Sequence, residues 1–396
     1  MKRRACLLLG FLLLFLLTGC SSTGGVYSNY RDIEDLQLAE TMGLDFDEKG
    51  VTLSISSSNS PKNPSPSVIS CHAKSISSAM EKIQNYTARK ELFYAHTRYV
   101  ILGESTAEHA LETILDYIER APQMRMDVML FVLKDAKASD LMTKATNSQY
   151  ELTKVLSSIE RELEMAGNGR VFTCTQVAQS LAGSGSALIS AISMTKTEDT
   201  VFSTKETTIA LPAGYAFFQD GTLLGFLTPK ISAGVNILQE KIGRNNFNLT
   251  DKNDNPVTIQ LNTVEPKFSP VWGSDGALEA IDVTVEATAS VVELTTEANL
   301  YNEEYLTELD KRFGKKIKTQ IEHVLDASRT YGTDFLELGK KIRLQDPVRF
   351  EKMPEEWIDV LPKLQFHLSV KGKVERTYSI TDPANMNGGG ISNAET

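Results

Sequence analysis

The chain has 396 residues, with 41 Lys and Arg against 51 Asp and Glu, and its net charge is -10. This acidic excess argues against a nucleic-acid-binding protein, because such proteins concentrate basic residues to neutralise phosphates. The length and the 41% hydrophobic content are typical of a globular protein with two or three domains. Four cysteines are too few for a disulfide scaffold or a zinc cluster.

The N-terminus has the pattern of a lipoprotein signal peptide over residues 1–19. Three basic residues precede an apolar run over 5–17, which is too short to span a bilayer comfortably. The Leu-Thr-Gly-Cys sequence that follows resembles a bacterial lipobox, in which the Cys20 thiol receives a diacylglyceryl group and the chain is cut between Gly19 and Cys20. An uncleaved anchor, or cleavage elsewhere, is the alternative interpretation. Cleavage at this point would leave 377 residues with a net charge of -13.

Cys71 and Cys174 would then be the remaining thiols of the chain. Outside the cytoplasm they could form a disulfide, although the sequence does not give the distance between them. Two separate buried cysteines are the other interpretation.

The first folded part is predicted to be a mixed α/β domain over 30–175, joined to the lipid by a flexible tether over 20–29. The expected helices cover 31–40, 74–90, 105–120, 135–146 and 150–165, and the expected strands cover 51–55, 98–103 and 127–133. The strand at 127–133 is almost continuously apolar, which is typical of a strand covered on both faces. A Pro-rich loop is expected over 57–67.

Glycines near 167–169 and 182–186 predict loops at the end of this domain. A small middle domain rich in strands is expected over 176–250, with strands at 207–211, 214–218 and 222–228. Asp220-Gly221 between apolar runs predicts a hairpin turn. These signals favour an antiparallel region.

The last domain is predicted to be α+β over 251–381, followed by a disordered tail over 382–396. Its clearest elements are a strand over 281–291, a long amphipathic helix over 302–329, a second helix over 335–342 and a half-buried strand over 364–370. The whole chain is thus expected to be an α+β protein of three mixed α/β domains, with predominantly antiparallel or mixed sheets.

Catalytic and metal-binding motifs are not evident in the sequence, so neither a catalytic residue nor a cofactor is predicted. The five histidines are scattered, with no His-Glu-x-x-His pair. Asp251, Asn253 and Asn255 imitate half of a calcium loop, but Pro256 stands where such a loop needs Gly, which favours a polar turn.

A basic cluster occupies 310–352, with 11 Lys and Arg against 7 Asp and Glu. Within it, Lys311, Lys315 and Lys318 share one side of the predicted helix. They could face anionic lipid or an acidic partner, and a solvated helix flank is the alternative.

The order of motifs resembles the spore-germination receptor C-subunit lipoproteins, the Ger(x)C family. The resembling segments after Cys20 are Arg31–Leu36, Met42–Asp45, His96–Glu104, Ala110–Leu111, Leu115–Arg120 with Arg125 and Val132, Gly214–Phe218, Leu223–Leu227, Gly234–Leu238, and Ala327–Gly339 with Pro347, Trp357 and the strand Leu364–Val374. Departures are Ser21, where the family often has Trp, and Phe350, near which another Trp is usual.

The resemblance implies a three-domain protein without enzymatic activity on the outer face of the spore inner membrane. It also implies assembly with two integral membrane subunits into a nutrient-germinant receptor, and attachment to the membrane through the diacylglyceryl group on Cys20. We expect a scaffold or coupling subunit that does not bind nucleic acid.

Two other classes share some of these features. A solute-binding lipoprotein of an importer would need two comparable doubly wound lobes, whereas the second half here runs several strands and then long helices. An envelope hydrolase would need a metal or paired-acid site.

Overall fold

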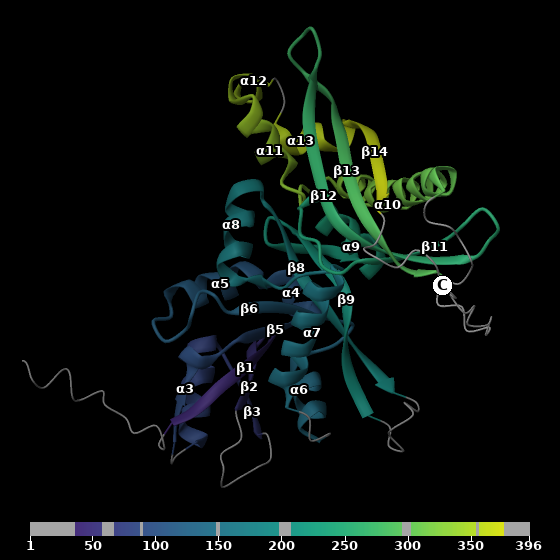
Figure 1. Ribbon diagram of the computed structural model, residues 1–396. Helices are drawn as coiled ribbons and strands as arrows, with labels where there is room; N and C mark the ends of the chain where they lie inside the picture. The colour runs from purple at the N-terminus through teal and green to yellow at the C-terminus, as the bar shows by residue number, and fades with distance from the viewer. Residues whose placement is uncertain are drawn as a thin grey trace, which may run out of the picture.

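The computed structural model describes residues 36–57, 67–87, 90–147, 151–197, 207–294, 302–353 and 356–375. Their strands form two sheets, one of ten strands and one of four (Figure 1). The larger sheet contains β1 (Leu36–Asp47), β2 (Gly50–Ser57), β3 (Ser67–Ala73), β4 (Glu91–Phe93), β5 (Tyr99–Gly103), β6 (Met129–Lys134), β7 (Phe172–Thr173), β8 (Ser186–Thr197), β9 (Thr207–Gln219) and β10 (Thr222–Leu227). An α+β fold with mixed sheets, as predicted from the sequence, is confirmed.

The larger sheet is parallel at its centre and antiparallel at its sides. Its main order is β10-β9-β8-β6-β5-β1-β2-β3, with β4 paired to β1 and β7 to β6. The neighbours β1, β5, β6 and β8 run parallel, and the hairpins β1–β2–β3 and β8–β9–β10 flank them. All strands from the start of the described chain to Leu227 therefore belong to one sheet.

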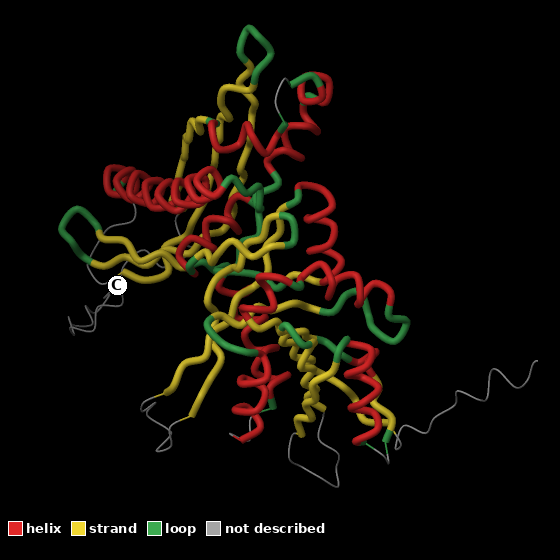
Figure 2. The backbone as a smooth tube through the Cα atoms, turned by 180° about the vertical axis from the view of Figure 1, so that it is seen from behind, coloured by secondary structure: helices red, strands yellow, loops and turns green. Residues whose placement is uncertain are grey.

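Helices cover both faces of this sheet (Figures 1 and 2). They are α3 (Ile76–Tyr86), α4 (Glu104–His109), α5 (Leu111–Arg120), α6 (Ala138–Asn147), α7 (Leu152–Ala166) and α8 (Cys174–Ser184). In β5, Val100 and Leu102 pack in the core with α3, α5 and α8, whereas Tyr99 and Ile101 pack with α6 and α7. Successive side chains of a strand point to opposite faces, so a central strand covered on both sides is apolar along its covered length, as β6 is from Met129 to Leu133.

The Met42–Asp45 segment shows why the sequence needs Gly and Asp in β1. A Cβ at Gly43 would lie 2.5 Å from the Met142 sulfur, so glycine allows α6 to approach the strand. The buried Asp45 carboxylate accepts hydrogen bonds from the backbone N–H groups of Ala138 at 2.7 Å and Ser139 at 2.9 Å. It therefore caps the first turn of α6.

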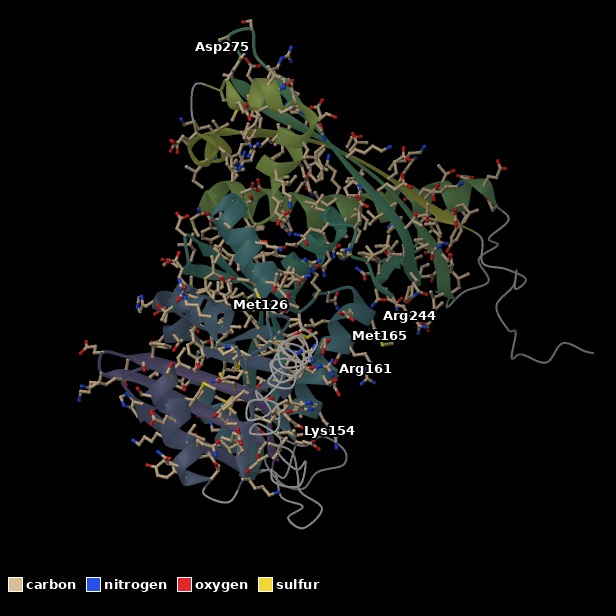
Figure 3. All side chains as sticks on the ribbon, turned by 90° about the vertical axis from the view of Figure 1, so that its left-hand side faces the viewer. Met126, Lys154, Arg161, Met165, Arg244 and Asp275 are labelled. Atoms are coloured by element: carbon tan, nitrogen blue, oxygen red, sulfur yellow. The ribbon has the colours of Figure 1, made fainter. Side chains whose placement is uncertain are left out.

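The second sheet has the order β11-β12-β13-β14. Its strands are β11 (Asn246–Thr250), β12 (Pro256–Trp272), β13 (Leu278–Leu294) and β14 (Gln365–Glu375), with β13 and β14 parallel. The associated helices are α9 (Pro229–Leu238), α10 (Glu303–Tyr331), α11 (Leu338–Gln345), α12 (Pro347–Glu351) and α13 (Trp357–Val360). The β12–β13 hairpin projects from the molecule, with Asp275 at its tip (Figure 3).

One face of the second sheet packs against α10. Along β13, Ile281, Val283 and Val285 are buried and alternate with exposed Asp282, Thr284 and Glu286. The buried residues share one hydrophobic core with the α10 side chains Leu309, Phe313, Ile317 and Ile321, which recur every four residues along the helix. The pattern that predicted the strand and the helix therefore also identifies the faces that contact each other.

Several expectations about individual elements are wrong. The helix predicted over 31–40 is, from Leu36 onward, the beginning of β1; Leu36 and Leu38 also fit the period of two, and pairing with β2, β4 and β5 satisfies the backbone. The loop predicted at 182–186 is mostly helix, since α8 extends to Ser184 and ends at Gly185 with φ 70°. The helix expected over 105–120 is divided at Ala110. The loop predicted at 57–67 and the tail over 382–396 lie largely or entirely outside the described residues.

The strands expected in a separate middle domain over 176–250 are grouped differently. β8, β9 and β10 lie in the ten-stranded sheet, and β11 lies in the four-stranded sheet. The Asp220-Gly221 turn between β9 and β10 is a hairpin, as predicted, with φ 48° and 73°. The three-domain division stays a prediction, and the sheet pairing joins the strands of the expected first and middle domains.

We predict that Gly372→Ala destabilises the second sheet. A Cβ at Gly372 would lie 2.7 Å from the backbone nitrogen of Gly314 and 2.8 Å from the Phe313 ring, where β14 crosses α10. Overpacking of this kind costs about 1–3 kcal/mol, so urea unfolding should show a lower free energy of unfolding by that amount. Gly183→Ala in α8 is the matched control, because a Cβ at that position would meet nothing within 4 Å. Equal stabilities of the two variants would contradict the close crossing.

Candidate functional site: the buried junction between the two sheets

The residues predicted as sites from the sequence are distributed as follows. Gly19 and Cys20 lie outside the described residues. Lys311, Lys315 and Lys318 lie exposed on α10, as the helical spacing predicts. Lys318 is 3.9 Å from Glu322, and Lys315 lines a surface cavity that also contains Lys230 of α9. The three lysines therefore have different surroundings, which sequence spacing does not distinguish.

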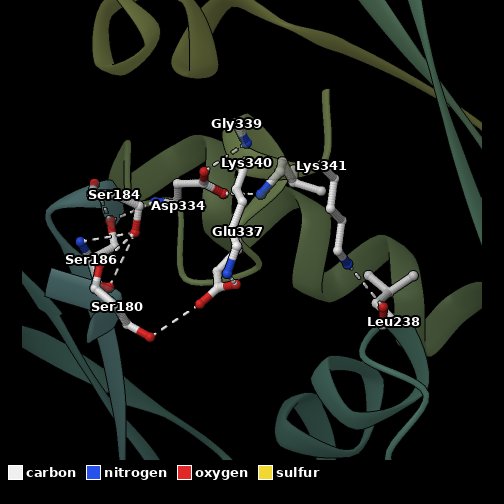
Figure 4. A network of polar contacts seen from close by, with 10 residues as sticks. Ser180, Ser184, Ser186, Leu238, Asp334, Glu337, Gly339, Lys340 and Lys341 are labelled. Carbon is white, nitrogen blue, oxygen red and sulfur yellow. Dashed lines mark hydrogen bonds and ion pairs between the residues drawn. The ribbon is translucent and has the colours of Figure 1, made fainter. Parts of the chain in front are cut away.

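A fully buried carboxylate, Asp334, organises the turn between α10 and α11. Its Oδ1 accepts a hydrogen bond from the backbone N–H of Leu338 at 2.7 Å, and its Oδ2 accepts one from Gly339 at 2.8 Å. The indole Nε1 of Trp357, on α13, donates to the same Oδ2 at 2.9 Å (Figure 4 shows the neighbouring contacts). Asp334 therefore fixes the first turn of α11 and attaches α13 to it.

Glycine at position 339 is required by this arrangement. A Cβ there would lie 2.8 Å from the Trp357 ring atoms. The close approach places the indole over the first turn of α11, within reach of Asp334.

The same turn bonds directly to the large sheet. The backbone N–H of Asp334 donates to the Ser186 hydroxyl at 3.0 Å, and that hydroxyl donates to Gln219 at 2.6 Å. Ser180 of α8 donates to the Glu337 carboxylate at 3.1 Å (Figure 4). The contacts join positions about 150 residues apart in sequence, so the turn holds the two sheets together.

Burial sets the electrostatics of this junction. It raises the pKa of Asp334 to about 6, against the three N–H donors, which favour the charged form. Burial also lowers the pKa of Lys341, while Asp334 and Glu337 oppose that change. The Lys341 ammonium donates to the Leu238 carbonyl at 3.2 Å and lies 4.2 Å from the Phe268 ring centroid. Lys341 therefore connects α11 to α9 and β12.

A second buried network lies where α7, β9 and α9 meet. The Tyr215 hydroxyl donates to the Asn236 side chain at 2.8 Å and accepts from the backbone N–H of Arg170 at 2.8 Å. Asn236 donates to the Gly167 carbonyl at 2.9 Å. Burial raises the pKa of Tyr215, so its phenol stays protonated and can donate.

Glycine also brings α9 against α10. A Cβ at Gly234 would lie 2.6 Å from the Gln320 carbonyl oxygen and 2.7 Å from a Val324 methyl group. Helix α9, which follows the large sheet, is therefore packed directly on the longest helix of the small-sheet part.

The residues with potential chemistry elsewhere are dispersed. Among the described residues, no group of three His, Cys, Asp or Glu side chains is placed to hold a metal ion. Asp251 accepts bonds from the backbone N–H groups of Asn253 at 2.8 Å and Asn255 at 2.9 Å, which makes the segment a polar turn. Cys71 and Cys174 are both buried free thiols, and burial raises the pKa of each.

Sequence reasoning missed Asp334, Tyr215 and Asn236 as buried polar positions of the junction, although all three lie within the motif segments that it singled out. The available signal was an Asp or Asn inside an otherwise apolar block, since a buried polar group needs hydrogen-bond partners. Their partners come from distant segments, which the sequence does not identify.

We predict that Asp334 makes the stability of the chain depend on pH. Because its folded-state pKa is raised, the folded form binds the proton more tightly, and this contribution is complete below about pH 4 and lost as the pH rises through about 6. Asp334→Asn removes the titration and leaves one backbone N–H facing an amide NH₂, which costs about 1–3 kcal/mol. Wild type should therefore exceed the variant in stability by more at pH 4 than at pH 7.

Urea unfolding at pH 4, 5, 6 and 7 measures this difference. The control is Asp254→Asn, an exposed residue at φ 62°, where Asn is readily accommodated. A difference between wild type and Asp334→Asn that grows with pH would contradict the raised pKa.

Comparisons with known proteins cover nearly the whole chain. Two family models match: one described as "Spore germination protein N-terminal domain" over 29–194, and one described as "Spore germination B3/ GerAC like, C-terminal" over 213–378. Spore germination protein KC of Bacillus subtilis (strain 168) is 24% identical over 415 aligned residues, which cover 96% of this chain and 98% of that protein. Spore germination protein B3 of the same organism is 22% identical over 377 residues, 92% and 95% of the two chains.

A solved structure shares the fold. The crystal structure of the GerBC protein superposes with a TM-score of 0.54 at 17% identity, covering 84% of this chain and 96% of that one. The two family models together match more than half of the chain and agree with the order of motifs in the sequence. The chain therefore belongs to the Ger(x)C family of spore-germination proteins, the C subunits of germinant receptors.

Proposed function

We propose that this chain is the lipid-anchored, non-catalytic subunit of a nutrient-germinant receptor and acts as a scaffold or coupling subunit with two integral membrane subunits. The observation that carries the proposal is that polar residues of the motif segments form hydrogen bonds within the chain. Asp45 caps α6, Tyr215 bonds Asn236, and Asp334 joins α11, α13 and the large sheet. These polar groups of the family segments bind other parts of the chain, as expected for a protein whose function depends on its shape and surfaces.

Membrane attachment in this proposal depends on the N-terminus. In the described part of the chain, no helix is long and apolar enough to cross a membrane. The diacylglyceryl group on Cys20 would hold the protein at the outer face of the spore inner membrane, because two acyl chains anchor a protein stably.

Coupling requires contacts that differ between the resting and signalling receptor. The junction offers a direct route between the two sheets, through the bonds from Ser180 to Glu337 and from Asp334 to Ser186. Glu337 is in the left-handed conformation at φ 54°, which costs a non-glycine residue on the order of 1 kcal/mol. Release of the Ser180 bond would favour relaxation of this turn, so a partner bound to one sheet could affect the other.

We predict that a Cys20→Ala strain loses nutrient germination. The thiol that carries the lipid is removed, so the protein should leave the inner-membrane fraction while its total amount stays normal. Immunoblots of fractionated spores and optical-density loss after nutrient addition measure the two effects. A Cys174→Ala strain is the control, because it also removes a thiol, but a buried one on α8 outside the lipobox. Normal germination in a complete deletion strain would contradict the functional assignment itself.

Cross-linking through the exposed lysines of α10 can identify the partners of this protein. We propose that Lys311, Lys315 and Lys318 face a membrane or an acidic partner, and amine-reactive cross-linking in spores should then join peptides containing them to integral membrane proteins. Recovery of two different membrane subunits supports the receptor. Recovery of importer components would favour the solute-binding alternative, and muropeptide release by the purified protein would favour the hydrolase.

A further inference from the structure

A basic cavity lies between α9, α10 and the β11–β12 hairpin. Its volume is about 610 Å³, and its cationic lining residues are Lys230, Arg312, Lys315 and Lys316. Lys230 comes from the first turn of α9, and the others come from the middle of α10, more than 80 residues further along the chain. The fold therefore brings together charges that the sequence separates.

The charge of this cavity is not balanced by its own lining. None of its lining residues is Asp or Glu, whereas each of four other cavities in the described part of the chain includes a carboxylate. One of those is the cavity of about 350 Å³ beside Arg161, Met165 and Arg244, which also contains Glu162 (Figure 3).

Only part of this positive charge is neutralised by neighbours. Arg312 donates to Glu308 at 2.8 Å, and no ion pair in the described part of the chain holds Lys230, Lys315 or Lys316. Arg312 and Lys316 are four positions apart on one helix, a spacing at which like charges destabilise the helix. Three cations without an ion pair thus lie beside Arg312 in one concavity, and a bound anion would reduce their mutual repulsion, although the overall charge of the chain is -10.

The cavity also contains polar groups suited to an uncharged part of a ligand. Gln320 lines the cavity, and its buried Oε1 has no hydrogen-bond partner among the described residues, so rotation of its side-chain amide toward the cavity would offer an unpaired acceptor to a ligand hydroxyl. Thr319 lies beside it on α10 and can donate or accept.

We propose that this cavity binds a phosphate ester that carries a free hydroxyl group, with Lys230, Arg312, Lys315 and Lys316 around the phosphate and Gln320 as acceptor for the hydroxyl. Phosphate offers several acceptor oxygens to ammonium and guanidinium groups, and hydrogen bonds between charged partners are the strong ones. A glycerol phosphate group has this chemistry, whether it is free or forms the headgroup of a lipid.

Titration calorimetry on the full-length protein in neutral detergent tests the proposal. The probes are inorganic phosphate, glycerol 1-phosphate, and the soluble short-chain lipids dihexanoyl phosphatidylglycerol and dihexanoyl phosphatidylcholine. Wild type should bind glycerol 1-phosphate more tightly than inorganic phosphate. The triple variant Lys230→Gln, Lys315→Gln, Lys316→Gln should bind it on the order of tenfold more weakly or worse. All three positions are exposed, so the fold should be retained.

A matched variant separates the cavity from the overall charge. Lys137→Gln, Lys371→Gln, Lys373→Gln removes the same three charges from exposed positions that do not line the cavity, and it should bind like wild type. Gln320→Leu should weaken the binding of glycerol 1-phosphate but not that of inorganic phosphate.

The source of the ligand is read from the lipid probes. Binding of the phosphatidylglycerol probe that the cavity triple variant loses identifies a lipid headgroup, and binding of glycerol 1-phosphate without that lipid identifies a free phosphate ester. Equal affinity of the two triple variants, or the absence of saturable binding to wild type, overturns the proposal. These measurements do not involve germination, so they stand or fall apart from the receptor assignment.

Discussion

The buried carboxylate of Asp334 is the interaction on which the arrangement of the two sheets depends. It accepts three N–H groups from α11 and α13, while its own backbone N–H donates to Ser186 at the start of β8. A carboxylate can be buried only when its hydrogen-bonding capacity is used, because the loss of hydration is otherwise too costly. This requirement determines the geometry of the turn that follows α10, and with it the position of the small-sheet part relative to the large sheet.

The other buried polar groups follow the same rule on a smaller scale. Asp45 begins α6, and the Tyr215–Asn236 pair connects β9, α9 and the end of α7. Gly234 and Gly372, which have no Cβ atom, allow α9 and β14 to approach α10 closely. Helix α10 therefore packs against both α9, which follows the large sheet, and β14 of the small sheet. Its exposed side carries charged residues such as Lys311, Lys315 and Lys318. The basic cavity lies at the border between that exposed side and α9.

For a subunit that works through its contacts, this construction has a consequence. Interior polar groups give one well-defined relation between the sheets, whereas surface charges such as those of Lys311 and Lys315 can interact with other molecules without affecting the core. A junction of this kind can also adopt discrete alternative arrangements, because packed interfaces switch between states and do not deform continuously. Glu337, with φ 54° and a hydrogen bond from Ser180 of α8, is an element of this kind at the junction.

The sequence alone determined the class of fold, most helices and strands, the family and the lipobox pattern at Cys20, because each of these depends on local periodicity or on a short contiguous motif. Only the tertiary structure decided that β8–β10 join the first sheet, that residues 36–40 are a strand, and that Lys230 lies with Lys315 and Lys316. The physical reason is that pairing between distant segments sets these features. In the sequence, Asp334 is only a polar residue near the start of a helix. Its role in joining α11, α13 and the large sheet is evident only from its hydrogen-bond partners, which include Ser186 and Trp357.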